Sequence, residues 1–367
     1  MISIIVKNLS AYSYRNLSGI SLEFCENINI IMGENGQGKT NVLEAVWFFT
    51  TGKSFRTASV KDCIMFNENA ARLSIEYNAY EYDNKCDIIL PANEKKQIKR
   101  NGIELKKTSE LVGSFTGVLF SPEHLTLVKD GAAPRRRFLD FAICQLRPKY
   151  LSLLLTYNKI LSQRNAVLRL AADKKQLDTL DVWDAKLAET AAVIINLRNS
   201  FVEKLQHYTS RIYSEISGSR EQMTLKYKWS GNNQPTDVNE VYEFLLAKLK
   251  KNRARELREY VTLCGPHRDD IEIFTDNKPA RYFASQGQQR SCVLALKIAE
   301  SELIHKEYGE YPVLLFDDVL SELDEGRQQY ILNKIQNKQV ILTCCELNKL
   351  SKIGEKKIFN IAKGEVS

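Results

Sequence analysis

The sequence predicts an α/β fold organised around a phosphate-binding loop. Residues 33–40 read G-E-N-G-Q-G-K-T. They follow the apolar, β-branched run 28–32 and precede residues 41–49, whose apolar positions repeat at helical spacing. A second apolar run, within 312–318, ends in two aspartates. Because the residues between these segments are mostly helical in pattern, we expect an α/β fold interrupted by a long helical insertion.

The glycine-rich loop has the composition of an anion cradle. Its glycines let backbone N–H groups turn inward without Cβ clashes at the start of a helix. Lys39 is expected to reach the β- and γ-phosphates of a nucleotide, and Thr40 to hold Mg²⁺. A plain glycine-rich turn is the alternative, but it does not require a strand before it and a helix after it. The expected nucleotide ligands are Gly33, Glu34, Asn35, Gly36, Gln37, Gly38, Lys39 and Thr40.

Length and composition limit the class of protein. With 367 residues, 44% of them hydrophobic, the chain can form one large two-lobed domain or two domains. No run of about 18 apolar residues is present, so no membrane span is expected, and the N-terminus lacks the order of a signal peptide. Eight scattered cysteines without a C-x-x-C pair predict free thiols in a reducing cytoplasm rather than a zinc site. The net charge of +7 permits a nucleic-acid partner without requiring one.

The first third of the chain is expected to be rich in strands. Arg15 lies in the turn between the first two, one strand pair before the phosphate loop, and either touches the nucleotide or is solvated. The expected strands are 2–9, 17–24, 28–32, 72–81, 85–90 and 117–120.

Two basic segments in this region are candidates for DNA contact. In the loop 52–56, Lys53 and Arg56 flank an aromatic residue, an arrangement suited to a phosphate backbone and a base; a solvated loop is the alternative. Segment 95–107 holds six cations around an Asn-Gly hairpin signal. It predicts either a DNA-binding arm or a charge-protected sheet edge. The candidate DNA ligands in this arm are Lys95, Lys96, Lys99 and Arg100.

The middle of the chain is predicted to be mostly helical. Residues 134–172 and 180–217 are expected helices, and the second keeps a 4-3 apolar spacing over about five heptads, too short for a long coiled-coil arm. After a strand at 223–229, the helix 238–260 carries a run of cations that forms either a solvated face or a face that tracks DNA. Residues 271–283 are expected to form a β-hairpin around Asp-Asn, with strands 271–274 and 280–283.

The last third supplies residues that complete a nucleotide site. The segment S-Q-G-Q-Q-R, residues 285–290, opens a helix expected over 291–306, and its first residue, Ser285, is a favourable N-cap. Asp317 is expected to hold Mg²⁺ directly or through water, and Asp318 to polarise the attacking water as the catalytic base. Two further strands are expected, at 339–344 and 359–363.

The order of these motifs resembles the RecF family of the ABC/SMC-type ATPases from end to end. The phosphate loop and D-D-V-L-S-E-L-D are shared with the superfamily, whereas L-F-S-P-E-H-L, R-R-R-F-L-D, G-P-H-R-D-D and S-Q-G-Q-Q-R point to RecF. The resemblance implies a two-lobed ABC-type P-loop ATPase head, a mixed sheet with a central helix, plus a mostly helical second lobe. It implies lobe I over 1–120 and 310–367, and lobe II with the signature motif over 121–309.

The resemblance also implies an ATP-driven clamp. ATP and Mg²⁺ would join two copies head to tail, so that the signature of one covers the γ-phosphate bound by the other, with Asp324 at the interface; hydrolysis would open this homodimer. DNA, whether single-stranded, double-stranded or at a junction, would cross the joined surface. The implied role is loading the recombinase filament with RecO and RecR, in recombinational repair, replication and the SOS response. The signature residues acting in trans are Ser285, Gln286, Gly287 and Gln288.

The sequence departs from the superfamily pattern in two places. ABC transporters usually carry Glu after the metal-binding Asp, and the shorter Asp318 fits a slow, switch-like ATPase. The histidine expected after the last core strand is absent, so Thr343 is expected to contact the γ-phosphate. Residues 121–123 fill the Gln-loop position, and the sequence leaves open which of them serves.

Three other interpretations are weaker. The ATPase subunit of a transporter gives no reason for the basic arm and the cationic helix. A nuclease of the overcoming-lysogenization type needs an acidic nuclease domain, and the sequence after Asp324 is short. A structural SMC-like tether needs a longer helical insertion. We therefore expect an ATP-dependent DNA-binding clamp of the cytoplasm, with no membrane partner.

Overall fold

The computed structural model describes residues 3–57, 59–170, 179–231, 234, 237–345 and 355–366. The chain divides into two compact units, unit 1 (Met1–Leu125 and Val293–Ser367) and unit 2 (Thr126–Cys292). Both boundaries differ from the expected ones, which followed residues 120 and 309. The second boundary falls inside one continuous helix, α9 (Gln286–Tyr308), whose later part packs with unit 1. An uninterrupted helical pattern gives no signal for such a boundary.

Unit 1 contains two six-stranded sheets. The first has the order β15-β14-β3-β13-β12-β8, in which β14 to β8 all run parallel. Its strands are β3 (Ile28–Met32), β8 (Gly117–Phe120), β12 (Val313–Asp317), β13 (Val340–Cys344), β14 (Lys356–Ala362) and β15 (Glu365–Val366). The second sheet is antiparallel, in the order β2-β1-β4-β5-β6-β7. Its strands are β1 (Ile5–Tyr14), β2 (Leu17–Glu23), β4 (Ala70–Ala79), β5 (Tyr82–Pro91), β6 (Gln97–Arg100) and β7 (Ile103–Glu104).

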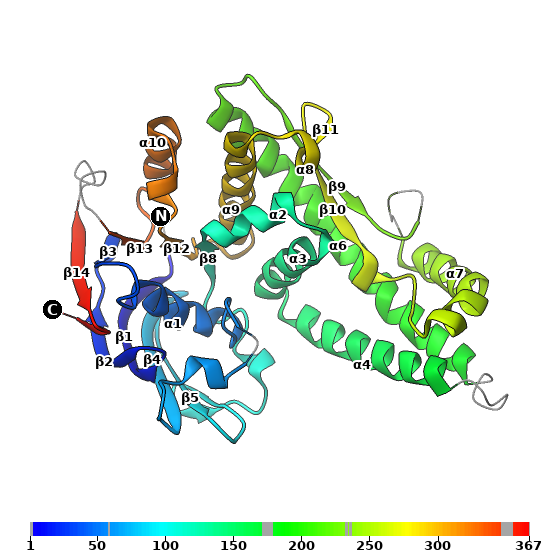
Figure 1. Cartoon of the computed structure of the whole chain (residues 1–367), viewed down its shortest axis with the longest axis horizontal. Coiled ribbons are helices and arrows are strands. Elements are labelled where there is room, and N and C mark those ends of the chain that lie inside the picture. The colour runs from blue at the N-terminus through cyan, green and yellow to red at the C-terminus, as the bar shows by residue number, and fades with distance from the viewer. Residues whose placement is uncertain are drawn as a thin grey trace. The chain divides into compact units, whose positions relative to one another are not determined.

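The helix α1 (Lys39–Thr51) lies between the two sheets (Figure 1). It contacts β8, β12 and β13 of the parallel sheet and β1 and β4 of the antiparallel sheet. Because α1 is covered on both sides, it is buried almost all round, as its nearly continuous apolar sequence requires. The predicted α/β fold with a central helix is therefore confirmed, and both sheets fix the start of α1, where the phosphate loop ends.

Unit 2 is mostly helical, with one small antiparallel sheet in the order β11-β10-β9. Its strands are β9 (Met223–Lys228), β10 (Asp270–Thr275) and β11 (Lys278–Pro279). Its helices are α2 (Thr126–Lys129), α3 (Ala132–Leu146), α4 (Pro148–Leu170), α6 (Leu180–Ser217), α7 (Val238–Glu259) and α8 (Ala280–Phe283), together with the start of α9. Among the described residues of unit 1, the remaining α-helix is α10 (Glu325–Lys334). Short 3-10 turns lie in unit 1 at Lys61–Cys63, Thr108–Glu110, Pro122–Leu125 and Leu320–Glu322, and in unit 2 at Pro266–Arg268.

Two predictions for unit 2 are wrong in detail. The helix expected over 134–172 is broken at Arg147, because Pro148 has no N–H and instead begins a new helix. The turn at Asp276-Asn277 is present, with left-handed φ angles of 48° and 62°. Its second strand, however, is only β11, which ends at Pro279, and the expected strand 280–283 is the short helix α8.

A buried ion network connects three helices of unit 2. Arg164 of α4, whose side chain is 0% exposed, donates to Asp184 of α6 at 2.7 Å and to Glu256 of α7 at 2.6 Å. Both carboxylates are also 0% exposed. Arg253 adds a second ion pair to Asp184 at 2.7 Å. Since every buried charge here has an opposite partner, the network holds α4, α6 and α7 together. Removing any one member would leave a buried charge without its partner.

The segments 135–140 and 265–270, far apart in sequence, meet in unit 2. Arg135 forms a bidentate ion pair with Asp270 at 2.7 and 2.8 Å. Arg136 donates to the backbone carbonyl of Asp269 at 2.8 Å, and burial raises the pKa of the Asp269 carboxyl to about 7. These contacts connect α3 to the start of β10.

No helix among the described residues has the length and apolarity that crossing a membrane requires.

Candidate functional site

The phosphate loop connects β3 to α1 with backbone conformations that favour glycine. Gly36 and Gly38 have φ angles of 81° and 113°. A Cβ at Gly33 would lie 2.3 Å from a carbonyl oxygen of β14. Left-handed residues placed between right-handed ones turn successive N–H groups to the same side, as in anion-binding nests. The turn between β14 and β15 contacts the loop, since the Gly364 N–H donates to the Gln37 carbonyl at 3.0 Å.

Lys39 lies within this loop. Its Nζ donates to the carbonyls of Gly33 and Glu34 at 2.7 and 2.8 Å, and the residue is only 7% exposed. The Cys345 Sγ lies 3.4 Å from the same Nζ and donates to the Asn35 Oδ1 at 3.2 Å. The thiol that follows β13 therefore contacts the loop directly. Sequence reasoning did not single out Cys345, because a cysteine beside a core strand is usually a packing residue.

Two predicted site residues donate to one carboxylate oxygen of a third. Thr40 and Thr343 donate to the Asp317 Oδ1 at 2.8 and 3.0 Å. They come from α1, β12 and β13, and Asp317 and Thr343 are direct cross-strand partners. Burial raises the pKa of the Asp317 carboxyl, and the two hydroxyl hydrogen bonds act in the opposite direction. Hydroxyl and carboxylate oxygens are the hard ligands that Mg²⁺ prefers.

Asp318 turns the chain at the end of β12. Its φ of 51° is left-handed, a conformation that costs a non-glycine residue about 1 kcal/mol. The Ser321 hydroxyl donates to the Asp318 carbonyl at 2.7 Å and to its Oδ1 at 2.9 Å. In addition, the Asp318 N–H donates to the Thr343 Oγ1 at 3.0 Å. These bonds hold the second aspartate in place beside the first.

Asp324 caps the helix that follows. Its Oδ1 accepts from the Arg327 N–H at 3.0 Å and its other carboxylate oxygen pairs with the Arg327 guanidinium. The backbone hydrogen bond is the main reason that the pKa of this carboxyl lies below its ordinary value. The carboxylate remains exposed.

Arg15 has a structural partner. Its Nε and Nη2 donate to the Glu44 carboxylate of α1 at 2.9 and 2.7 Å, and its Nη1 donates to the Asp62 carbonyl. The Glu44 side chain is 0% exposed, so the guanidinium neutralises a buried charge. The neighbouring Asn16 is the residue that reaches the loop, where it donates to the Gly36 carbonyl at 3.3 Å and accepts from Asn41 at 2.7 Å. Asparagine is so common in turns that its type alone gave no signal.

Two of the expected DNA ligands lie against α1. Lys96 donates to the Gly52 carbonyl at the C-terminal end of the helix. Burial, with a contribution from the nearby charge of Lys53, lowers the pKa of Lys96 to about 8. Arg56 donates to the Asn41 Oδ1 in the first turn of α1 at 2.8 Å. Arg56 is therefore beside the phosphate loop, and Lys96 is a helix-end ligand.

The remaining candidates of the basic arm are more accessible. Lys53, Lys95 and Lys99 are exposed, and Arg100 is half-buried. Lys99 and Arg100 lie on β6 with their side chains on opposite faces of the antiparallel sheet.

The signature segment begins α9 with a reciprocal cap. The Gln288 N–H donates to the Ser285 Oγ at 3.2 Å, and the Ser285 N–H donates to the Gln288 Oε1 at 2.8 Å. The Gln288 Nε2 also donates to Glu221 at 2.9 Å. Ser285 and Gln286 remain exposed, and Gly287 is half-buried. This segment belongs to unit 2, whereas the phosphate loop belongs to unit 1.

Comparison with known proteins shows which family shares this arrangement. The RecF/RecN/SMC N-terminal domain matches residues 5–366. The DNA replication and repair protein RecF of Clostridium beijerinckii is 39% identical over 363 residues, covering 98% of each chain. The corresponding RecF of Clostridium botulinum is 41% identical over 352 residues, covering 96% of this chain and 95% of the other.

Solved structures agree with the sequence comparison. The recombination mediator protein RecF-ATPrS of the RecFOR pathway superimposes with a TM-score of 0.93 at 37% identity, covering 100% of this chain and 98% of the other. The RecF-ATP structure superimposes with a TM-score of 0.91 at the same identity, covering 100% and 99%. The Smc head domain of Pyrococcus furiosus, at 15% identity and a TM-score of 0.57 over 99% of this chain and 95% of the other, shares the fold alone. The predicted resemblance is confirmed, and the chain belongs to the RecF family.

Proposed function

We propose that the protein is an ATP-dependent DNA-binding protein of recombinational repair, in which slow ATP hydrolysis acts as a switch. The observation that carries the proposal is the convergence of Thr40 and Thr343 on Asp317 beside a glycine loop that encloses Lys39. The relatives support it, since they are DNA replication and repair proteins and one solved structure is of RecF-ATP.

In the proposed site, each residue has one task. The loop N–H groups and Lys39 bind the phosphates of ATP, and Thr40 with Asp317 would hold Mg²⁺, which neutralises phosphate charge when bound. Thr343 keeps the Asp317 carboxylate oriented through its 3.0 Å hydrogen bond. Asp318, held by Ser321, orients the attacking water and accepts its proton.

The proposed switch is a homodimer that ATP joins head to tail. The signature residues Ser285, Gln286 and Gly287 of one copy would cover the γ-phosphate bound by the other, with Asp324 at the interface. The dimer would bind single-stranded, double-stranded and junction DNA and would act with RecO and RecR to load the recombinase during repair, replication and the SOS response. The RecFOR pathway of the related structures supports these partners.

Replacing Asp318 by asparagine is expected to stabilise the ATP-bound dimer. The substitution removes the proton acceptor but keeps the side-chain size and the left-handed turn, so ATP binds while hydrolysis slows by about 100-fold or more. Light scattering with and without ATP measures the mass, and a phosphate-release assay measures hydrolysis. Wild type is expected to shift from monomer to dimer with ATP and return as ATP is consumed. A constant mass for both proteins would remove the dimer mechanism and leave the nucleotide site standing.

Alkylating Cys345 with N-ethylmaleimide is expected to weaken ATP binding by at least about tenfold. The adduct is bulky, and the thiol lies 3.4 Å from the Lys39 Nζ, so the adduct overlaps the space that the phosphates need. Bound ATP should slow the alkylation, which mass spectrometry follows at the peptide level. Cys345→Ser is the matched control, since it should bind ATP and lose its sensitivity to the reagent. Full ATP binding by the alkylated wild type would show that Cys345 does not face the nucleotide.

A further inference from the structure

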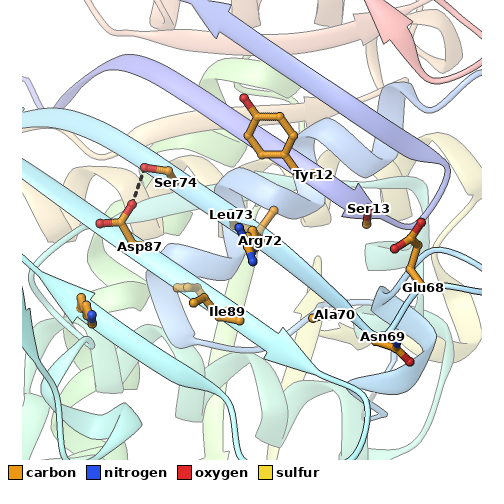
Figure 2. A pocket seen from close by; sticks show the side chains of 12 residues that line it. Tyr12, Ser13, Glu68, Asn69, Ala70, Arg72, Leu73, Ser74, Asp87 and Ile89 are labelled. Carbon is orange, nitrogen blue, oxygen red and sulfur yellow. Dashed lines mark hydrogen bonds between the residues drawn. The ribbon is translucent and has the colours of Figure 1, made fainter.

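The outer face of the antiparallel sheet holds a cavity of about 780 Å³ that the nucleotide site does not use (Figure 2). Its walls come from β1, β4, β5 and β6 and from the loop before β4. Tyr12 and Arg72 lie on neighbouring strands at this face (Figure 2). Small side chains such as Ser13 and Ala70 leave the hollow between them.

Strand register determines how the side chains of this face line up. Tyr12 is the cross-strand partner of Gly19 on one side and of Arg72 on the other. In the adjacent row, Asp87 is the partner of Lys99. Directly opposed residues have Cβ atoms about 5 Å apart. One ring and two cations therefore face the same hollow.

The Tyr12 ring packs on the sheet with one face open to solvent. A Cβ at Gly19 would lie 3.2 Å from the Tyr12 Cδ1, so the ring packs closely over this position. The residue is nevertheless 51% exposed. A ring supported from below and open above is the arrangement on which an unpaired base stacks.

The charged side chains of the cavity are nearly balanced. Within the described part of the chain, neither Arg72 nor Lys99 has an ion-pair partner. Asp87 accepts a hydrogen bond from the Ser74 hydroxyl at 2.7 Å (Figure 2), and Glu68 lines the rim. The two carboxylates would repel a continuous row of phosphates, such as a duplex presents. The two cations can still bind a single phosphate. A carboxylate also accepts hydrogen bonds from the amino groups of an unpaired base.

We propose that this cavity binds one unpaired nucleotide of single-stranded DNA, with its base stacked on Tyr12 and its phosphate held by Arg72 and Lys99. The inference rests on the proposed DNA-binding function and specifies which surface makes contact with the single strand. It explains why an aromatic residue and two cations stand together around a hollow whose other lining residues include Ser74, Asn69 and Ile89. It also separates Lys99 from Lys96, whose ammonium is bound at the end of α1.

The test compares single-stranded and duplex binding in the full-length protein. Fluorescence anisotropy with labelled oligothymidine and ATP is expected to show about 5- to 100-fold weaker binding for Tyr12→Ala, and less than a twofold change with a blunt duplex. Tyr12→Phe keeps the ring and should bind as wild type. Tyr82→Ala is the matched control, because Tyr82 is 73% exposed on the same sheet and does not line the cavity. Because Arg72 and Lys99 are proposed to hold one phosphate, the double variant Arg72→Ala, Lys99→Ala should lower the slope of the salt dependence on single strands by about 0.7 in a log-log plot.

Different results overturn different claims. If wild type binds no DNA with ATP, the proposed function fails and this inference with it. If wild type binds but Tyr12→Ala matches it on single strands, or loses duplex binding equally, the DNA-binding function stands and the cavity is not its single-strand site. Ultraviolet crosslinking of wild type to an oligonucleotide with 5-iodouracil identifies the contacting peptide without any substitution in the protein. Recovery of the label on the Tyr12 peptide supports the inference, and its recovery only elsewhere contradicts it.

Discussion

Lys39→Ala is expected to abolish ATP binding at micromolar nucleotide. The Lys39 ammonium is the side-chain cation inside the loop, held there by two backbone carbonyls. Removing one partner of a desolvated charge pair costs about 2–5 kcal/mol, which corresponds to roughly 30- to 5,000-fold in affinity. Isothermal titration with a slowly hydrolysed ATP analogue measures the loss. Light scattering should show no ATP-dependent dimer.

The controls separate loss of the ligand contact from loss of the fold. Lys53→Ala removes an exposed cation just after the same helix and should bind ATP normally. The free energy of unfolding of the Lys39→Ala variant should lie within about 1–2 kcal/mol of the wild-type value, since the substitution leaves only two carbonyl acceptors unpaired. If Lys39→Ala binds ATP as tightly as Lys53→Ala does, the phosphate-loop assignment is wrong.

Arg164→Ala is expected to lower the free energy of unfolding of unit 2 by about 3–5 kcal/mol. The substitution leaves the carboxylates of Asp184 and Glu256 in the interior without their shared partner. It also leaves a cavity where the long side chain packed. Urea unfolding followed by far-ultraviolet circular dichroism measures the change.

An exposed ion pair on α7 provides the comparison. Arg255 pairs with Glu259 at 2.6 Å, and both side chains are largely exposed. Arg255→Ala should therefore change stability by no more than about 0.5 kcal/mol. The triple variant Arg164→Met, Asp184→Asn and Glu256→Gln should recover part of the loss, because it removes the uncompensated charges. A loss below about 1 kcal/mol for Arg164→Ala would mean that water or rearranged neighbours compensate the two carboxylates.

Local sequence was sufficient wherever a property depends on adjacent residues. The strand β3, the glycine loop and α1 occur where they were expected, because glycine requirements, apolar periodicity and helix starts act over a few residues. The helix α6 begins and ends at the predicted residues for the same reason. Asp317 at the end of an apolar strand was recognisable because a buried strand rarely ends in carboxylates without a task for them.

Ion-pair and hydrogen-bond partners that are distant in sequence could not be predicted from local sequence. Arg15 was expected either to touch the nucleotide or to be solvated, and its guanidinium pairs with Glu44. Lys96 was a candidate DNA ligand on an arm that could also be a charge-protected edge, and its ammonium donates to the end of α1. Each is a cation in a polar loop, and residue type does not tell which distant carboxylate or carbonyl will lie within 3 Å. The break at Arg147 had a local cause in Pro148, and the helical pattern on either side concealed it.

The sequence by itself therefore determined the local features of this protein: a glycine loop between a strand and a helix, an apolar strand that ends in two aspartates, the capped start of α9 and membership of a family. Only the tertiary structure decided which residues share a site. The strand order β3-β13-β12 places the Thr40 and Thr343 hydroxyls on the Asp317 carboxylate and places Cys345 beside Lys39. The register of β1 with β4 places Tyr12 beside Arg72. Strand order and register follow from the packing of side chains on both faces of each sheet, which is a property of the whole core and not of any one segment.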